Sequence, residues 1–85
     1  MPKSMSLTAG GGQGLDQALA CTLRRLRREA GSTQEDLAHE AGITVAALAR
    51  IERGQANPLW TTVRRIIGAL GISLSELVAE VEGAG

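Results

Sequence analysis

Four glycines divide most of this chain into short helical segments. Each follows a stretch in which apolar residues recur three or four positions apart, the spacing of one buried helix face; these glycines are Gly31, Gly42, Gly54 and Gly71. Glycine favours the position just past a helix end because it adopts the left-handed backbone conformation without steric cost. The chain is therefore limited to short helices that must pack against one another, and its fold class is predicted to be all-α.

Capping residues mark where several of these helices begin. Hydroxyl side chains accept hydrogen bonds from the free N–H groups of a first helical turn, and they stand at Thr33, Thr44 and Ser73. Asp36 and Glu76 lie three positions after Thr33 and Ser73, the spacing of a capping box. Together with a segment that begins at Leu15 and one that begins near Pro58, the caps predict five helices.

The length of the chain sets its domain organisation. Its 85 residues provide enough apolar surface for one core and not for two. Residues 1–14 are rich in glycine and small polar side chains and lack helical periodicity, so they are expected to be a flexible arm. Residues 15–82 are expected to form the single domain. Within it, Trp60 begins an apolar stripe and is expected in the core.

The sequence argues against several classes of protein. No apolar run approaches the roughly 18 residues needed to cross a bilayer, and the start lacks the layout of a secretory signal. We therefore expect a cytoplasmic protein without membrane contact. One histidine and one cysteine, Cys21, supply neither a metal cage nor a nucleophile with its base. We expect no enzyme activity, no cofactor and no metal, and an exposed free thiol at Cys21.

The segment Thr33–Gly54, TQEDLAHEAGITVAALARIERG, indicates function. Two short helices are joined there by a turn that contains Gly42, and Ala38 is small enough to lie where the two helices cross. A helix-turn-helix needs this arrangement. It leaves the second helix protruding, so that its N-terminal end can enter a DNA major groove.

The same segment and its surroundings resemble a known family. The runs LRRLRREAG, TQEDLAHEAGIT, ALARIERGQANP and LGISLSELV occur in this order over about Leu19–Val81. Together they are similar to the lambda- and 434-repressor-like, or XRE, family of helix-turn-helix regulators. The resemblance implies a five-helix lambda-repressor-like DNA-binding domain with the helix-turn-helix at its second and third helices. It also implies a sequence-specific transcriptional regulator, and most members of the family repress.

The resemblance further implies roles for individual residues. Gln34 matches a phosphate contact at the start of the second helix. The recognition helix covers about residues 44–53, and its groove-facing positions match Thr44, Val45, Ala46 and Arg50. Backbone-phosphate contacts after that helix match Arg53, Gln55 and Asn57. Glu52 matches a carboxylate that pairs with a first-helix arginine, here Arg27, as a structural ion pair.

The recognition helix departs from the usual family pattern. Its VAALAR stretch offers apolar groups at Val45, Ala46, Ala47 and Ala49, which can contact thymine methyls but cannot hydrogen-bond to base edges. Only Arg50 and Thr44 offer such hydrogen bonds, Arg50 most naturally to guanine. On residue type alone, Gln34 and Arg50 could also be solvated surface side chains. The apolar helix and the zero net charge favour an alternative, a protein-interaction module such as an antitoxin or an anti-repressor.

The expected partners follow from these features. Double-stranded DNA is the main one, and a further protein partner is possible under the alternative. One recognition helix reads only a few base pairs, so a homodimer on a pseudo-palindromic site is expected. The final helices, Val63 to Val81, offer the apolar surface for such a dimer.

Overall fold

The computed structural model describes residues 14–84. Residues 1–13 of the expected arm 1–14 lie outside this range. The described part contains helices and no strand, which confirms the all-α prediction. In chain order the helices are α2 Gln17–Glu29, α3 Gln34–Ala41, α4 Val45–Glu52, α5 Trp60–Leu70 and α6 Leu74–Ala84. None of these helices is long and apolar enough to cross a membrane.

The helix starts follow the capping chemistry. The hydroxyl of Thr33 accepts from the N–H of Asp36, and that of Thr44 accepts from the N–H of Ala47, both at 3.0 Å. Ser73 and Glu76 form a complete capping box, in which each side chain accepts from the other residue's N–H. The first helix begins two residues after Leu15, because the Asp16 carboxylate caps it by accepting from the N–H of Leu19.

The helix ends follow the glycines. All four punctuating glycines have positive φ, between 72° and 75°. Gly42 takes this conformation at the end of α3, in a turn of only three residues that leads into α4. A residue with a Cβ would strain the backbone there.

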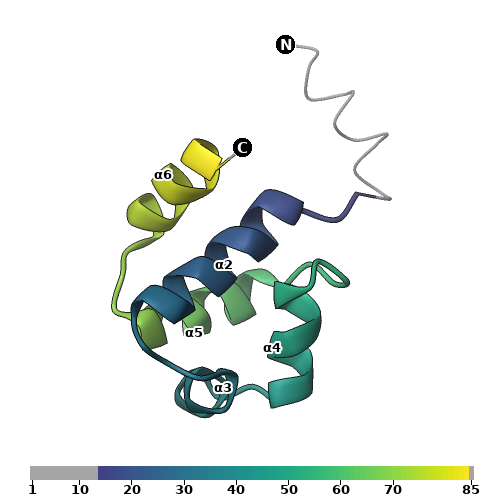
Figure 1. The fold of residues 1–85 in the computed structure, drawn as a ribbon, viewed down its shortest axis with the longest axis vertical. Coiled ribbons are helices and arrows are strands. Elements are labelled where there is room, and N and C mark those ends of the chain that lie inside the picture. The colour runs from purple at the N-terminus through teal and green to yellow at the C-terminus, as the bar shows by residue number, and fades with distance from the viewer. Residues whose placement is uncertain (1–13, 85) are drawn as a thin grey trace.

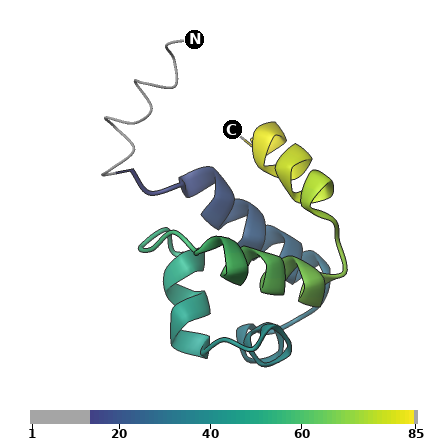
Figure 2. The same cartoon turned by 180° about the vertical axis from the view of Figure 1, so that it is seen from behind.

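The core is shared by all five helices, with α3 packed against α4 and α5, and α2 packed against α4 and α6. Helices α3 and α4 lie toward one end of the domain and α6 lies at the other (Figures 1 and 2). The largest fully buried apolar side chains come from four helices: Leu23, Leu37, Leu48 and Ile66. Helix α6 adds Leu77 to the same cluster. One core therefore holds α4 against the rest of the domain.

Trp60 does not lie in this core, so its predicted burial is wrong. It is 55% exposed, because it is the first residue of α5 and lies at the end of the helix. The buried positions of the stripe begin one turn later, at Val63 and Ile66. Cys21 is an exposed free thiol, as predicted.

Candidate DNA interface

The turn between α3 and α4 is built from small residues and backbone hydrogen bonds. Ala38 and Ala41 are buried on α3, which lets the second helix approach closely. The N–H of Ile43 donates to the carbonyl of Ala38 at 3.0 Å. Leu48 and Ile51 then anchor the inner side of α4 in the core. The two helices thus form a helix-turn-helix in which the opposite side of α4 faces outward.

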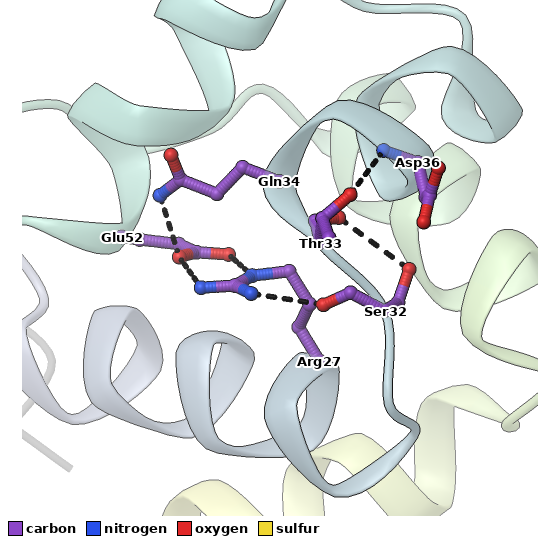
Figure 3. Close-up of polar contacts among 6 residues, drawn as sticks. All are labelled: Arg27, Ser32, Thr33, Gln34, Asp36 and Glu52. Atoms are coloured by element: carbon purple, nitrogen blue, oxygen red, sulfur yellow. Dashed lines mark hydrogen bonds and ion pairs between the residues drawn. The ribbon is translucent and has the colours of Figure 1, made fainter.

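A buried ion pair holds α4 to the first helix of the domain (Figure 3). Arg27 on α2 donates from Nε to Glu52 Oε2 at 2.8 Å and from Nη2 to Oε1 at 2.9 Å. Its Nη1 donates to the carbonyl of Ser32 at 2.9 Å. The two residues that the family resemblance paired therefore meet in a bidentate contact, the strongest geometry for this pair of groups.

Gln34 belongs to the same cluster. Its Nε2 donates to Glu52 Oε1 at 3.0 Å, so the amide that the resemblance assigned to a phosphate is shared with the ion pair (Figure 3). One hydrogen of this amide remains for another acceptor. The first N–H groups of α3 also lack partners within their own helix. The cluster therefore links the end of α2, the start of α3 and the end of α4.

Burial and pairing act on Glu52 in opposite directions. Burial raises the pKa of its carboxyl group, but the hydrogen bonds from Arg27 and Gln34 and the charge of Arg27 outweigh this and hold the pKa below its usual value. The hydrogen bond to Glu52 raises the pKa of the Arg27 guanidinium, although burial opposes it. Both groups are charged at neutral pH, and only 9% of Arg27 and 3% of Glu52 are exposed.

The outward side of α4 carries the predicted groove-facing residues. Thr44, Val45, Ala46 and Arg50 are all exposed there. Ala49 is only 9% exposed and packs inward, so the expectation that it could contact a base is wrong. Ala47 is half-buried. The apolar part of the outward face is therefore smaller than the VAALAR stretch suggests, and it lies at the N-terminal end of the helix.

The loop after α4 makes contacts that sequence reasoning missed. The Oδ1 of Asn57 accepts from the N–H of Asp16 at 2.8 Å, and its Nδ2 donates to the carbonyl of Gly14 at 2.9 Å. Gln17 donates to the carbonyl of Gly54 at 3.1 Å. No local sequence pattern predicts these hydrogen bonds, because their partners are about 40 residues apart along the chain. Asn57 thus fastens the loop to the start of α2, and its contact with a phosphate stays a prediction.

The other two loop residues that were expected at phosphates contact each other. Arg53 Nε donates to Gln55 Oε1 at 3.3 Å, and both side chains are exposed. The N–H of Gln55 also donates to the carbonyl of Arg50 at 2.9 Å. The structure thus brings Arg53 and Gln55 together at the C-terminal end of α4, and their contact with DNA stays a prediction.

Comparison with known proteins identifies the family. A helix-turn-helix family model matches residues 23–77, which is most of the chain and includes the whole of α3 and α4. The chain belongs to the XRE-type family of helix-turn-helix regulators.

Curated relatives of this family member are regulators by name. It is 41% identical over 58 residues to an uncharacterised HTH-type transcriptional regulator of Sinorhizobium fredii, covering 68% of this chain and 75% of that one. It is 40% identical over 58 residues to an immunity repressor protein of Bacillus phage phi105. This match covers 68% of this chain and 40% of the repressor. This chain thus spans well under half of the phage protein.

Solved structures share the fold. The clp gene regulator ClgR from Corynebacterium glutamicum superimposes with a TM-score of 0.78 at 28% identity, covering 84% of this chain and 76% of that chain. A variant of the restriction-modification controller protein C.Esp1396I gives a TM-score of 0.79 at 26% identity, covering 82% of this chain and 93% of that chain. These likenesses extend beyond α3 and α4 to most of the domain.

Replacement of Glu52 by alanine should destabilise the domain strongly. The variant leaves the buried guanidinium of Arg27 without its carboxylate, and breaking such a pair typically costs about 3 kcal/mol or more. Urea unfolding measures the change. The matched control is Glu29→Ala, which breaks an exposed pair with Arg25 and should leave the unfolding midpoint almost unchanged. Equal midpoints for both variants would contradict the account.

The loss of stability caused by Glu52→Ala should depend on pH. A carboxyl group with a lowered pKa in the folded state stabilises that state above its unfolded pKa, about 4.3 for glutamate, and this stabilisation is lost as the pH falls through the lower folded value. The difference in free energy of unfolding between the native chain and Glu52→Ala should therefore be largest near neutral pH and shrink below about pH 4. A difference that stays constant down to pH 3 would contradict an ionised Glu52.

Proposed function

We propose that this chain is a sequence-specific DNA-binding transcriptional regulator that inserts the N-terminal end of α4 into the major groove. The observation that carries the proposal is the fixed presentation of α4. Its inner side is anchored in the core and its last turn is held by the Arg27–Glu52 pair, while Val45, Ala46 and Arg50 face outward. We propose that this regulator acts in the cytoplasm.

The distribution of charge supports this function although the net charge is zero. Three glutamates are engaged with arginines of the first helix: Glu52 with Arg27, and Glu29 and Glu80 with Arg25. Within residues 14–84, Arg50 has no ion pair or side-chain hydrogen bond of its own. An unengaged guanidinium on an outward helix face can form the two parallel hydrogen bonds that guanine offers in the major groove.

The names of the relatives support repression as the mode of regulation. The phage relative is an immunity repressor, and one structural neighbour controls a restriction-modification system. A domain that occupies a promoter by groove contact alone blocks access to it without any further activity. We therefore infer that the chain represses transcription by occupying its site.

Sites selected by this protein from random DNA test the proposal. Affinity should fall steeply with salt, since bound phosphates release counterions. Arg50→Ala should weaken binding to the selected site by at least about tenfold relative to a scrambled site. Arg64→Ala, which removes an exposed arginine from α5, is the matched control and should leave the ratio between the two sites unchanged.

Two outcomes would overturn the DNA-binding proposal. One is a selection that enriches no sequence, and the other is binding that is insensitive to salt and to Arg50→Ala. The apolar end of α4 would then be a protein-binding surface, as in an antitoxin or an anti-repressor on the same fold.

We further propose that the chain binds DNA as a homodimer. Exposed apolar side chains lie where α5 begins, at Leu59 and Trp60, and along α6, at Leu74 and Val78. Trp60 and Val78 border an open groove of about 300 Å³ between the first turns of α2 and α5 and the length of α6. A two-fold axis at this groove would bury the same surface of both copies. It would also double the number of base pairs read.

The only aromatic residue of the chain reports on this dimer. Trp60 should emit at shorter wavelength as the protein concentration rises, because the partner copy would remove its indole from water. Val78→Arg puts a charge into the groove and should leave a monomer in sedimentation equilibrium. Ala79→Arg on the same helix lies outside the residues that line the groove and should still dimerise. A wild-type monomer at micromolar concentration, with unchanged tryptophan emission, would refute this interface.

A further inference from the structure

The outward N-terminal end of α4 has almost no hydrogen-bonding capacity. The hydroxyl oxygen of Thr44 accepts from the N–H of Ala47 at 3.0 Å, which leaves the hydroxyl hydrogen as the one side-chain donor at this end. Val45 follows it and is 38% exposed, and Ala46 is exposed beside it. Arg50 lies one turn after Ala46 on the same face. This surface can therefore make apolar contacts through Val45 and Ala46, and its polar contacts come from the Thr44 hydroxyl that precedes them and from the Arg50 guanidinium further along.

The major groove offers one apolar group on its base edges, the C5-methyl group of thymine. Cytosine lacks this group, but 5-methylcytosine carries it at the same position of the ring. The two methylated bases differ in the exocyclic group at C4, a carbonyl acceptor in thymine and an amino donor in 5-methylcytosine. Neither Val45 nor Ala46 can hydrogen-bond to that group, so they have no means of telling the two bases apart.

We propose that Val45 and Ala46 recognise pyrimidine C5-methyl groups, so that this chain accepts 5-methylcytosine where it selects thymine. Binding to a site with cytosine at that position then responds to cytosine methylation. The inference rests on the proposed function, because it requires the N-terminal end of α4 to lie in the major groove.

Modified DNA tests the proposal directly. In a site selected from random DNA, each thymine is replaced in turn by deoxyuridine, which removes the methyl group and nothing else. At one or two positions affinity should fall about fourfold, the equivalent of one buried methyl-sized group. At those positions a C·G pair should bind as weakly as the uracil pair or more weakly. The same pair with 5-methylcytosine should return to within about twofold of thymine.

Two variants connect this effect to its side chains. Val45→Ala removes two methyl groups from an exposed position, and alanine favours the helix, so the variant should fold normally. Its ratio of affinities for thymine and uracil sites should fall toward one. Arg50→Ala is the matched control: it should weaken binding to both sites and preserve their ratio, since the guanidinium contacts a different base.

The outcomes separate this inference from the proposed function. Equal affinity for thymine and uracil at every position, with Arg50→Ala still reducing selectivity, overturns methyl recognition and leaves the DNA-binding function in place. A thymine-to-uracil ratio that is unchanged in Val45→Ala, or a 5-methylcytosine site as weak as the cytosine site, also overturns it. A selection that enriches no sequence overturns both.

Discussion

The Arg27–Glu52 pair is the interaction on which the working surface of this domain depends. It joins the middle of the chain to its first helix at a point where both charged groups are almost fully removed from water. Such a pair is stable only when the remaining donors and acceptors are also satisfied. Here the carbonyl of Ser32 and the amide of Gln34 meet that requirement. The end of α2, the start of α3 and the end of α4 are consequently fixed relative to one another.

Gln34 takes part in this fixation. The side chain that the family resemblance places against a DNA phosphate also bonds to the carboxylate that holds α4. A phosphate bound at the start of α3 would therefore lie next to the buried Arg27–Glu52 pair. Asn57 and Gln17 add a second tie, between the loop after α4 and the start of α2. The recognition helix is thus held at its C-terminal end, while its N-terminal end is left free to meet a ligand.

The predictable part of this structure is the part that local chemistry determines. Thr33, Thr44 and Ser73 cap the helices that they were expected to start, because a cap involves residues only three positions apart. The glycines end helices for a similarly local reason. Fold class and the outward position of Val45, Ala46 and Arg50 followed from this framework together with the family resemblance.

The parts that could not be predicted depend on distances across the fold. Trp60 fits the apolar stripe of its helix, yet as the first residue of α5 it borders an open groove and stays 55% exposed. Ala49 was predicted to offer its methyl group to a base together with Val45 and Ala46, but it packs inward. The bonds of Asn57 to the start of α2 have no counterpart in any sequence pattern. The apolar groove beside Trp60 likewise exists only because α6 lies where it does.

Backbone amide NMR during titration with a selected DNA site tests the central claim most directly. The claim is that a rigid cluster presents the N-terminal end of α4 to the major groove. It predicts the largest shift changes at the amides of residues 44–50 and at the start of α3, with the Arg27 and Glu52 side chains still paired in the complex. Unperturbed amides in α4, with the changes confined to α6 or to the outer face of α2, would contradict it.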